Sequence, residues 1–197
     1  MKVILLRHGE TAGNAMKRYI GATDEPLSTA GREAALAVPP DRTVGAVFVS
    51  PLLRARETAS LLFPAARQYI VPDLREMDFG VFENRSYTEM EDDADYRAWV
   101  QSGCTLPCPR GESMESFSLR TEAAFVSCIE QAKRLRLENA VFCVHGGTIM
   151  AVMHRFASDK KTYYEWCVQN LCGYSAKIVQ NTPGGSISLG SIRKISR

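Results

Sequence analysis

The sequence predicts an α/β protein, a three-layer α/β/α sandwich with a mostly parallel central sheet, a C-terminal antiparallel hairpin and a small helical cap. Two observations carry this prediction. Short apolar runs typical of buried strands alternate with segments of helical pattern through the first 156 residues. Two strand-like segments, 173–180 and 186–194, then flank a turn that contains Pro183 and Gly184, which is typical of a hairpin.

The first third of the chain supplies two predicted strands and two predicted helices. Val3 to Leu6 is an apolar run that fits a strand buried on both faces. A polar, glycine-bearing stretch ends at Gly31, and the alanine-rich segment after it suits a helix that Pro39 stops. Ser50 is expected to cap the next helix, with Pro51 at its first position. The predicted elements are strands at 3–6 and 44–50 and helices at 32–38 and 51–63.

The middle of the chain is polar and helical in pattern over residues 86–134. Prolines and glycines interrupt this pattern at 103–111. We therefore expect two helices joined by a loop, forming a cap inserted at about 83–112 into a single domain, 1–197. The remaining predicted elements are a short strand at 69–71, a third core strand at 140–147 and a helix at 148–156.

Length and composition limit what the protein can be. With 197 residues, of which 45% are hydrophobic and 23% charged, the chain has the size and balance of one globular domain. The net charge of +2 gives no general nucleic-acid signal. No apolar stretch approaches the roughly 18 to 20 residues of a membrane span, and the opening run lacks the features of a signal peptide. We therefore expect a cytoplasmic protein that binds neither nucleic acid nor membrane and keeps its six cysteines as thiols.

Basic side chains follow the predicted strands at the points where the strands end. Arg7 and His8 come after the first strand, Arg54 lies near the start of the helix after the second, and His145 lies at the end of the third. Parallel neighbouring strands would bring these side chains to one edge of the sheet, where ligands bind in α/β folds. Two guanidinium and two imidazole groups at that edge predict a phosphoryl group as the ligand. Three glycines would let backbone amides approach the same anion: Gly9, Gly146 and Gly147.

The two histidines indicate chemistry beyond binding. Neutral imidazole is a nucleophile near neutral pH, so one histidine could carry the phosphoryl group while the other, protonated, stabilises charge on its oxygens. Such a transfer requires no metal and no other cofactor. An ester leaving group also needs a proton, and Glu76 could supply it, because burial beside an anion raises the pKa of a carboxyl. Glu10 is expected to be a structural partner of Arg7.

Four segments, in this order, resemble the signature blocks of the histidine phosphatase superfamily, also called the phosphoglycerate mutase-like family: LRHGETAGN, SPLLRARETA, LREMDFGVFE and VHGGT. The resemblance covers nearly the whole chain, from Val3 to the helix after Thr148. The catalytic residues that it implies are His8 as the phosphorylated nucleophile, Arg7, Arg54 and His145 in the phosphate pocket, and Glu76 as the proton donor.

The resemblance also implies contacts with the substrate. The side chain of Asn14 would contact the phosphoryl group, and the backbone amide of Gly146 would help to hold it. Ile20, Gly21 and Thr23 correspond to the segment that lines the substrate side, although the aromatic residue often found in this loop is absent.

Within the superfamily the chain resembles phosphatases more than mutases. Phosphoglycerate mutases are longer and carry extra basic residues in the cap, whereas the cap segment 83–99 is acidic here. REMDFG, the residues from Tyr96 to Trp99 and PRGES are similar to α-ribazole phosphatases of the cobalamin nucleotide-loop pathway, although Phe82 replaces their usual tryptophan. We therefore expect a small phosphate monoester as the partner, with a neutral or basic far end, and α-ribazole 5′-phosphate is the candidate.

Other interpretations stay open at this point. A phosphoglycerate mutase-type transfer and an inactive phosphoprotein-binding module both fit parts of the pattern. The acidic run of the cap can equally be a solvated helix face. The sequence does not fix the oligomeric state, and a homodimer is one option. Two further sets have a functional and a packing interpretation: a four-thiolate zinc site at Cys104, Cys108, Cys167 and Cys172, and substrate stacking by Trp99, Tyr163, Tyr164 and Trp166.

Overall fold

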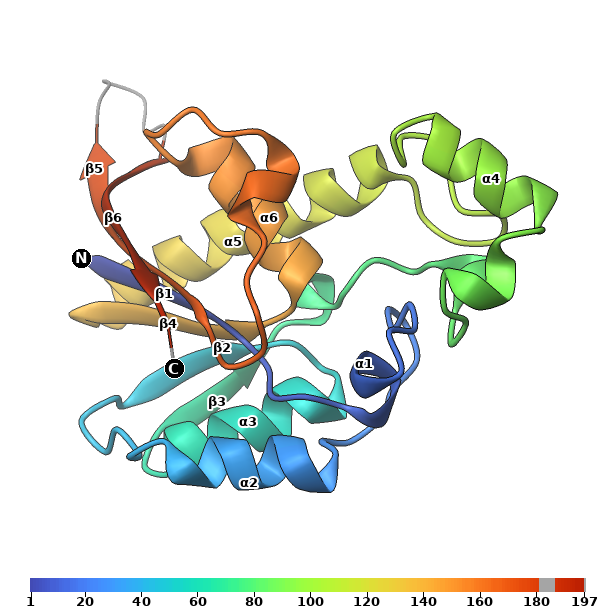
Figure 1. The fold of residues 1–197 in the computed structure, drawn as a ribbon. Coiled ribbons are helices and arrows are strands. Elements are labelled where there is room, and N and C mark those ends of the chain that lie inside the picture. Colours follow the sequence, from blue (N-terminus) through green and yellow to red (C-terminus); the bar gives the residue numbers. More distant parts are fainter. Residues whose placement is uncertain (181–186, 197) are drawn as a thin grey trace.

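The fold is built around one six-stranded sheet. The computed structural model describes residues 1–180 and 187–196. The strands lie in the order β3-β2-β4-β1-β5-β6 across the sheet (Figure 1). The first four of these pair in parallel, whereas β5 pairs antiparallel with both β1 and β6. The strands are β1 (Lys2–Arg7), β2 (Ala46–Val49), β3 (Arg67–Ile70), β4 (Asn139–Val144), β5 (Gly173–Gln180) and β6 (Ile187–Ile195).

The prediction of a mostly parallel sheet closed by an antiparallel hairpin is confirmed. Each apolar run marked a strand because a parallel strand covered on both faces has no polar side to show. The predicted hairpin turn at 181–185 lies outside the described residues. β1 occupies an interior place between β4 and β5, so the residues that follow it emerge at the middle of the sheet edge.

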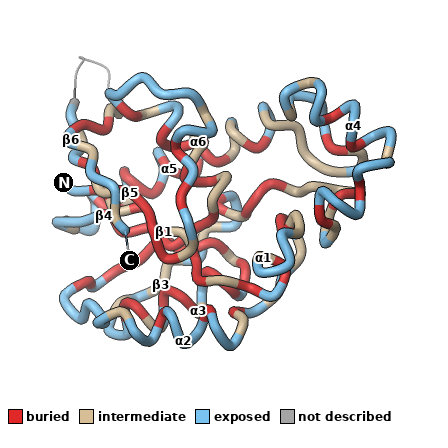
Figure 2. The backbone as a smooth tube through the Cα atoms, viewed as in Figure 1, coloured by how far each residue is buried: buried red, intermediate tan, exposed pale blue. Residues whose placement is uncertain are grey.

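Helices cover both faces of the sheet, which gives the three predicted layers. On one face Phe142 of β4 shares an apolar cluster with Phe125 and Val152 of the helices above it. On the other face Val47 of β2 shares a cluster with Ala59. Buried residues follow the sheet and the inner sides of these helices (Figure 2). The first face carries α5 (Met114–Arg134) and α6 (Gly146–Phe156), and the second carries α2 (Thr29–Ala37) and α3 (Leu53–Leu62).

The cap lies beside one end of α5, away from the sheet (Figure 1). It contains α4 (Ala94–Gln101) and several short 3₁₀ turns. Its core is a separate apolar cluster in which Phe82, Tyr96 and Trp99 pack with Phe117 of α5. The expectation that both helices of this region form the cap is wrong for α5. Its buried residues continue along the whole helix, so only its first turn belongs to the cap and the rest covers the sheet.

Three helices begin at residues other than the predicted ones, and α6 begins at Gly146, two residues before its predicted start. α2 begins three residues earlier, because the Ser28 hydroxyl oxygen accepts a hydrogen bond from the amide of Gly31 and caps the helix there. α3 begins at Leu53 without a side-chain cap, so the prediction that Ser50 caps it is wrong. The Ser50 hydroxyl oxygen accepts from the amide of Leu52, the residue before α3, at 3.3 Å, and it lies 2.6 Å from Nε2 of His145. A short additional helix, α1 (Ala12–Ala15), follows β1.

The described residues contain no disulfide, no membrane-spanning helix and no cluster of metal ligands. None of the six cysteines forms a disulfide. Over the described part of the chain, no helix is long and apolar enough to cross a membrane. No group of three or more His, Cys, Asp or Glu side chains that could hold a metal ion occurs among the same residues.

Candidate active site

His8 lies directly after β1 and is almost completely buried. Its Nδ1 lies 2.6 Å from the carbonyl oxygen of Gly9. A carbonyl only accepts, so Nδ1 carries the proton and Nε2 keeps the lone pair. Burial lowers the pKa of His8 well below its ordinary value, and the charges of Arg54 and Arg7 lower it further. The unliganded site therefore holds His8 neutral, with Nε2 as a free nucleophile.

His145 sits beside His8 at the start of α6, with the two ring centroids 5.1 Å apart in an edge-on contact. Its Nε2 contacts the Ser50 hydroxyl, while its buried Nδ1 has no protein partner. Burial and then the charge of Arg54 lower the pKa of His145. A hydroxyl can donate or accept, so Ser50 supports either protonation state, and a bound anion would favour the protonated one.

Arg54 and Arg7 border the histidines with partly unused guanidinium groups. Arg54 is fully buried on α3 and donates to the carbonyl oxygens of Thr23 at 2.7 Å and Gly21 at 2.8 Å. Arg7 donates from Nη1 to the carbonyl oxygen of Val168 at 2.8 Å. The Nε atoms of both arginines are buried without a partner. Such nitrogens are costly to leave unpaired, so this cluster is built to receive an anion.

Glu76 reaches the same place from the loop after β3. One carboxylate oxygen accepts from the amide of Gly147 at 2.8 Å and the other from the amide of Met77 at 3.0 Å. Burial raises the pKa of Glu76, although these amides and the two arginines oppose the shift. A Cβ on Gly147 would lie 2.4 Å from the carboxylate, so a glycine is needed for this close approach.

The predicted substrate residues fall into two groups. Asn14, Gly146 and Ile20 line the cavity that His8 and Glu76 border. Asn14 Oδ1 accepts from Asn170 at 3.2 Å, which leaves its amide nitrogen for a ligand. Gly21 and Thr23 do not line this cavity, because their amides bind a carboxylate behind the loop and their carbonyls bind Arg54.

Sequence reasoning missed two supporting groups. Asn170, in the loop before β5, donates to the backbone oxygen of His8 at 3.0 Å and thus joins His8 to Asn14. Arg120 of α5 donates to the backbone oxygen of Glu76 at 2.9 Å and to both carboxylate oxygens of Glu112. Both residues lie far along the chain from the groups that they hold, so no local pattern pointed to them.

Comparison with known proteins agrees with this arrangement. The model of the histidine phosphatase superfamily, branch 1, matches residues 3–185. The chain belongs to this superfamily. The alpha-ribazole phosphatase of Shigella flexneri has a crystal structure that superposes with a TM-score of 0.78 at 28% identity, over 91% of this chain and 92% of that one. The phosphoglycerate mutase of Thermus thermophilus gives 0.70 at 26% identity, over 100% and 99%.

A curated relative bears the name of a mutase. The probable phosphoglycerate mutase GpmB of Klebsiella pneumoniae (strain 342) is 37% identical over 137 residues, which are 66% of this chain. The chain spans 64% of the length of that relative. The relatives of this chain therefore carry two activities in their names.

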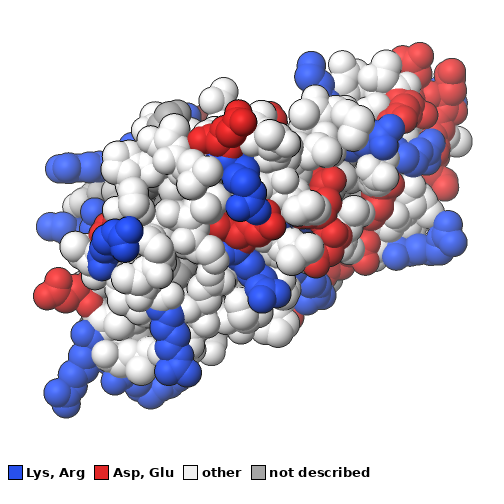
Figure 3. Space-filling model, turned by 90° about the horizontal axis from the view of Figure 1, so that it is seen from below, with Lys and Arg blue, Asp and Glu red and all other residues white. Residues whose placement is uncertain are grey.

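The cavity that His8 and Glu76 border has a volume of about 310 Å³ and extends from His8 to the cap. Its far wall is mainly aromatic and apolar. Arg18 is the cation of that wall, and its guanidinium donates to Glu89 at 2.9 Å and to Asn84 at 3.3 Å. The acidic side chains of the cap gather at the end of the molecule that carries α4 (Figure 3). The far wall consists of Tyr19, Phe79, Trp99, Cys104, Met114, Phe117, Met150, Tyr163 and Tyr164.

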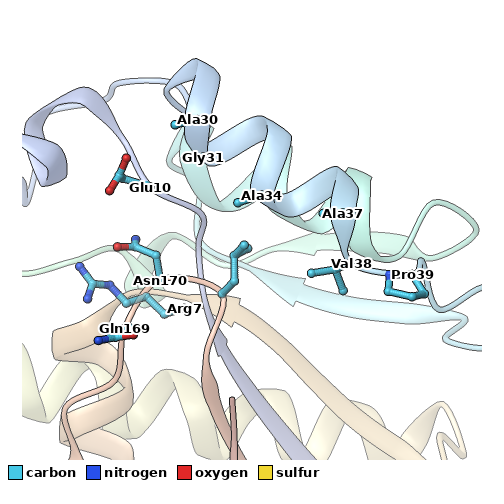
Figure 4. Close-up of a pocket in the computed structure, with 11 residues that line it drawn as sticks. Arg7, Glu10, Ala30, Gly31, Ala34, Ala37, Val38, Pro39, Gln169 and Asn170 are labelled. Carbon is cyan, nitrogen blue, oxygen red and sulfur yellow. The ribbon is translucent and has the colours of Figure 1, made fainter. Parts of the chain in front are cut away.

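A second, wider groove runs between α2 and residues 169–171 (Figure 4). Arg7 and Glu10 both border it. Among the described residues they form no ion pair, so the expected partnership is wrong. Glu10 contributes its backbone instead, whose oxygen accepts from the amide of Ser28.

Proposed function

We propose that the protein is a metal-independent phosphomonoesterase that works through a phosphohistidine. The observation that carries the proposal is the placement of a neutral His8, with Nε2 unprotonated, among buried donors that have no protein partner. In the first step Nε2 attacks phosphorus and the ester P–O bond breaks. Glu76, protonated, gives its proton to the leaving oxygen.

The second step returns the enzyme to its starting state. Water, deprotonated by Glu76, attacks the phosphorus of phosphohistidine, and the P–N bond breaks to give inorganic phosphate and neutral His8. Arg7, Arg54 and a protonated His145 stabilise the charge on the phosphoryl oxygens in both steps. No step asks for a metal, so EDTA should leave the rate unchanged.

The aromatic wall supports a substrate whose leaving alcohol carries a flat, uncharged group. Tyr19, Phe79 and Trp99 contact one another edge to face, with centroids 5.1 to 6.4 Å apart, and offer ring surface to the cavity. The cation of the wall, Arg18, is already bound by Glu89. We infer α-ribazole 5′-phosphate as the substrate and cobalamin biosynthesis as the setting, which the name of the Shigella relative supports.

The competing function is a phosphoglycerate mutase, favoured by the names of the Klebsiella and Thermus relatives. A mutase must bind a second acidic group at the far end of the cavity, where this chain offers aromatic rings and a neutralised arginine. The purified protein should therefore release phosphate from α-ribazole 5′-phosphate with a kcat/KM at least about tenfold above that for 3-phosphoglycerate. Isomerisation of 3-phosphoglycerate without phosphate release would establish the mutase instead.

A phosphoprotein-binding module without turnover is the other alternative. Hydrolysis of p-nitrophenyl phosphate excludes it at once, because that ester needs no particular leaving-group site. The same assay in the presence of EDTA tests the metal-independence of the reaction.

A further inference from the structure

Glu83, at the start of the cap, accepts hydrogen bonds from five donors on one carboxylate. It accepts from the amides of Gly21 at 3.1 Å, Ala22 at 2.8 Å and Thr23 at 3.2 Å. The Thr23 hydroxyl donates to it at 2.6 Å, and the amide of Phe79 donates at 3.0 Å. Five donors on one carboxylate fix its position. Glu83 is not among the residues that line the substrate cavity, and these five donors, not a ligand, occupy its carboxylate.

The loop that Glu83 binds is also bound by Arg54 from the opposite side. Arg54 donates to the carbonyl oxygens of Ile20 at 3.3 Å, Gly21 at 2.8 Å and Thr23 at 2.7 Å. The amides of the loop thus point to the carboxylate and its carbonyls to the guanidinium. Peptide dipoles aligned between opposite charges favour both charges. The loop is therefore a rigid spacer that sets where the guanidinium of Arg54 lies.

The same carboxylate also fixes the segment that follows Glu76. Its bond to the amide of Phe79 lies three residues beyond the proton donor. Gly21 packs so closely on this segment that a Cβ there would lie 1.8 Å from the backbone oxygen of Met77. Glu83 consequently joins the loop that holds Arg54 to the loop that carries Glu76, on the two sides of the phosphate position.

We propose that Glu83 is a positioning residue for phosphoryl binding and transfer: it acts through the 20–23 loop on Arg54 and through Phe79 on Glu76. The inference rests on the proposed function, because the phosphate position is the one assigned there. Its effect should appear in the affinity for the phosphoryl group itself, which can be measured without turnover.

The test measures binding of inorganic phosphate to the full chain by isothermal titration calorimetry, with folding checked by circular dichroism and thermal melting. In Glu83→Gln the side chain keeps one acceptor oxygen but turns an NH₂ group toward amide donors, so the loop must shift. We expect a phosphate Kd about tenfold higher. Glu83→Asp keeps the carboxylate but is one methylene shorter, so its phosphate Kd should lie between those of wild type and Glu83→Gln.

Glu57→Gln is the matched control. Glu57 lies on α3, one turn from Arg54, and its carboxylate also holds a loop, through the amide of Leu27 at 2.9 Å. Its other partner is Arg32, at 3.1 Å, on the outer side of α2. Neither partner belongs to the catalytic group around His8, so the phosphate Kd of this variant should equal that of wild type.

A graded loss of affinity, from wild type through Glu83→Asp to Glu83→Gln, supports the inference. Folded variants that bind phosphate as wild type does, with only a lower melting temperature, overturn it, and Glu83→Asp alone decides if Glu83→Gln does not fold. A wild-type protein that binds phosphate but does not hydrolyse p-nitrophenyl phosphate contradicts the proposed function only. One that binds no phosphate contradicts both.

Discussion

The two ends of the substrate cavity are built in different ways. At the catalytic end, polar side chains come from the segments after β1 and β3, from α3 and from the residue that precedes α6. Backbone groups hold them: His8 by the Gly9 carbonyl, Glu76 by the amides of Gly147 and Met77. At the cap end, the rings of Tyr19, Phe79 and Trp99 pack edge to face, and the hydroxyls of Tyr19 and Tyr96 lie 2.9 Å apart. Hydrogen bonds to the backbone hold single side-chain atoms in place at the catalytic end, whereas ring packing shapes an apolar wall at the cap end.

This contrast separates what each end contributes. The catalytic end leaves Arg7 Nε, Arg54 Nε and His145 Nδ1 unpaired in the absence of ligand, an arrangement that costs stability and favours a bound anion. The cap end buries aromatic surface and gains stability from it. The chemistry should therefore be sensitive to single atoms at the catalytic end, and specificity should change gradually at the cap end.

The largest effect is expected from His8→Ala. It removes the nucleophile while the arginines and His145 remain, so kcat should fall by about 10⁴-fold or more and phosphate binding should persist. Rapid quenching of the wild type with labelled substrate should trap an acid-labile, alkali-stable phosphoenzyme that the variant lacks. Substantial phosphatase activity in His8→Ala would contradict the assignment of His8 as the nucleophile.

Glu76→Gln should have the next largest effect. It removes the proton donor, so kcat/KM for an alkyl phosphate should fall by about 10² to 10³-fold. With p-nitrophenyl phosphate the loss should be smaller, because nitrophenolate leaves without a proton and kcat/KM reports only the steps up to its release. Equal losses for the two esters would show that Glu76 acts on something other than the leaving oxygen.

The pH dependence of Glu76 supplies a control within the same variant. Because burial raises the pKa of Glu76, wild-type kcat/KM for alkyl esters should decline as pH rises through that value, and the decline should vanish in Glu76→Gln. A raised folded-state pKa also means that the stability due to the protonated carboxyl is complete below the unfolded pKa and is lost as pH rises through the folded one. The melting temperature of wild type should therefore fall relative to that of Glu76→Gln as pH rises through the folded pKa, in addition to any fixed cost of turning an NH₂ group toward the amide of Gly147 or Met77. A difference between the two melting temperatures that does not change with pH would contradict this titration.

At the cap end, Tyr164→Ala tests specificity. Tyr164 is 55% exposed at the cavity and contacts Tyr163 edge to face. Its loss should raise KM for α-ribazole 5′-phosphate by about three- to tenfold, with kcat nearly unchanged and KM for glycerol phosphate unaffected. Tyr87→Ala is the matched control, since Tyr87 is 54% exposed and lies outside this cavity. A similar rise for both esters would mean that Tyr164 shapes the phosphate end as well.

The same contrast explains what the sequence could and could not predict about the fold. The core strands could be predicted because strands covered on both faces are apolar throughout. The gathering of polar residues at one edge could be predicted because neighbouring parallel strands end at the same edge of the sheet. The start of α2 was predicted wrongly because Gly31 was taken as the end of the preceding loop, whereas it lies inside the helix. A Cβ there would lie 2.0 Å from the backbone oxygen of Glu10, so this glycine serves a tertiary approach that local propensity does not show.

At the site, the polar side chains that the structure brings together could be predicted from the sequence, and the residues that hold them in place could not. His8, Arg54 and Glu76 stand in blocks with their own pattern, and the structure brings them together. Ser50 was predicted to cap a helix, but its hydroxyl contacts His145. Glu83 binds a loop some sixty residues earlier in the chain, and such pairings arise only when the fold brings the segments together.

The smallest expected effect concerns how the acidic cap disfavours a substrate with a second anionic group. It tests whether this depends on the single ion pair of Glu89 with Arg18 or on the total negative charge of the cap. Hydrogen bonds from Ser86 lower the pKa of Glu89, so its carboxylate stays ionised on Arg18. Glu89→Gln should free that guanidinium and lower the inhibition constant of 3-phosphoglycerate by about two- to threefold, an effect that salt should weaken. Glu91→Gln removes the same charge from the cap without touching Arg18. Equal shifts in the two variants would show a general field, whereas a shift confined to Glu89→Gln would show that one ion pair keeps the far wall closed to a second anion.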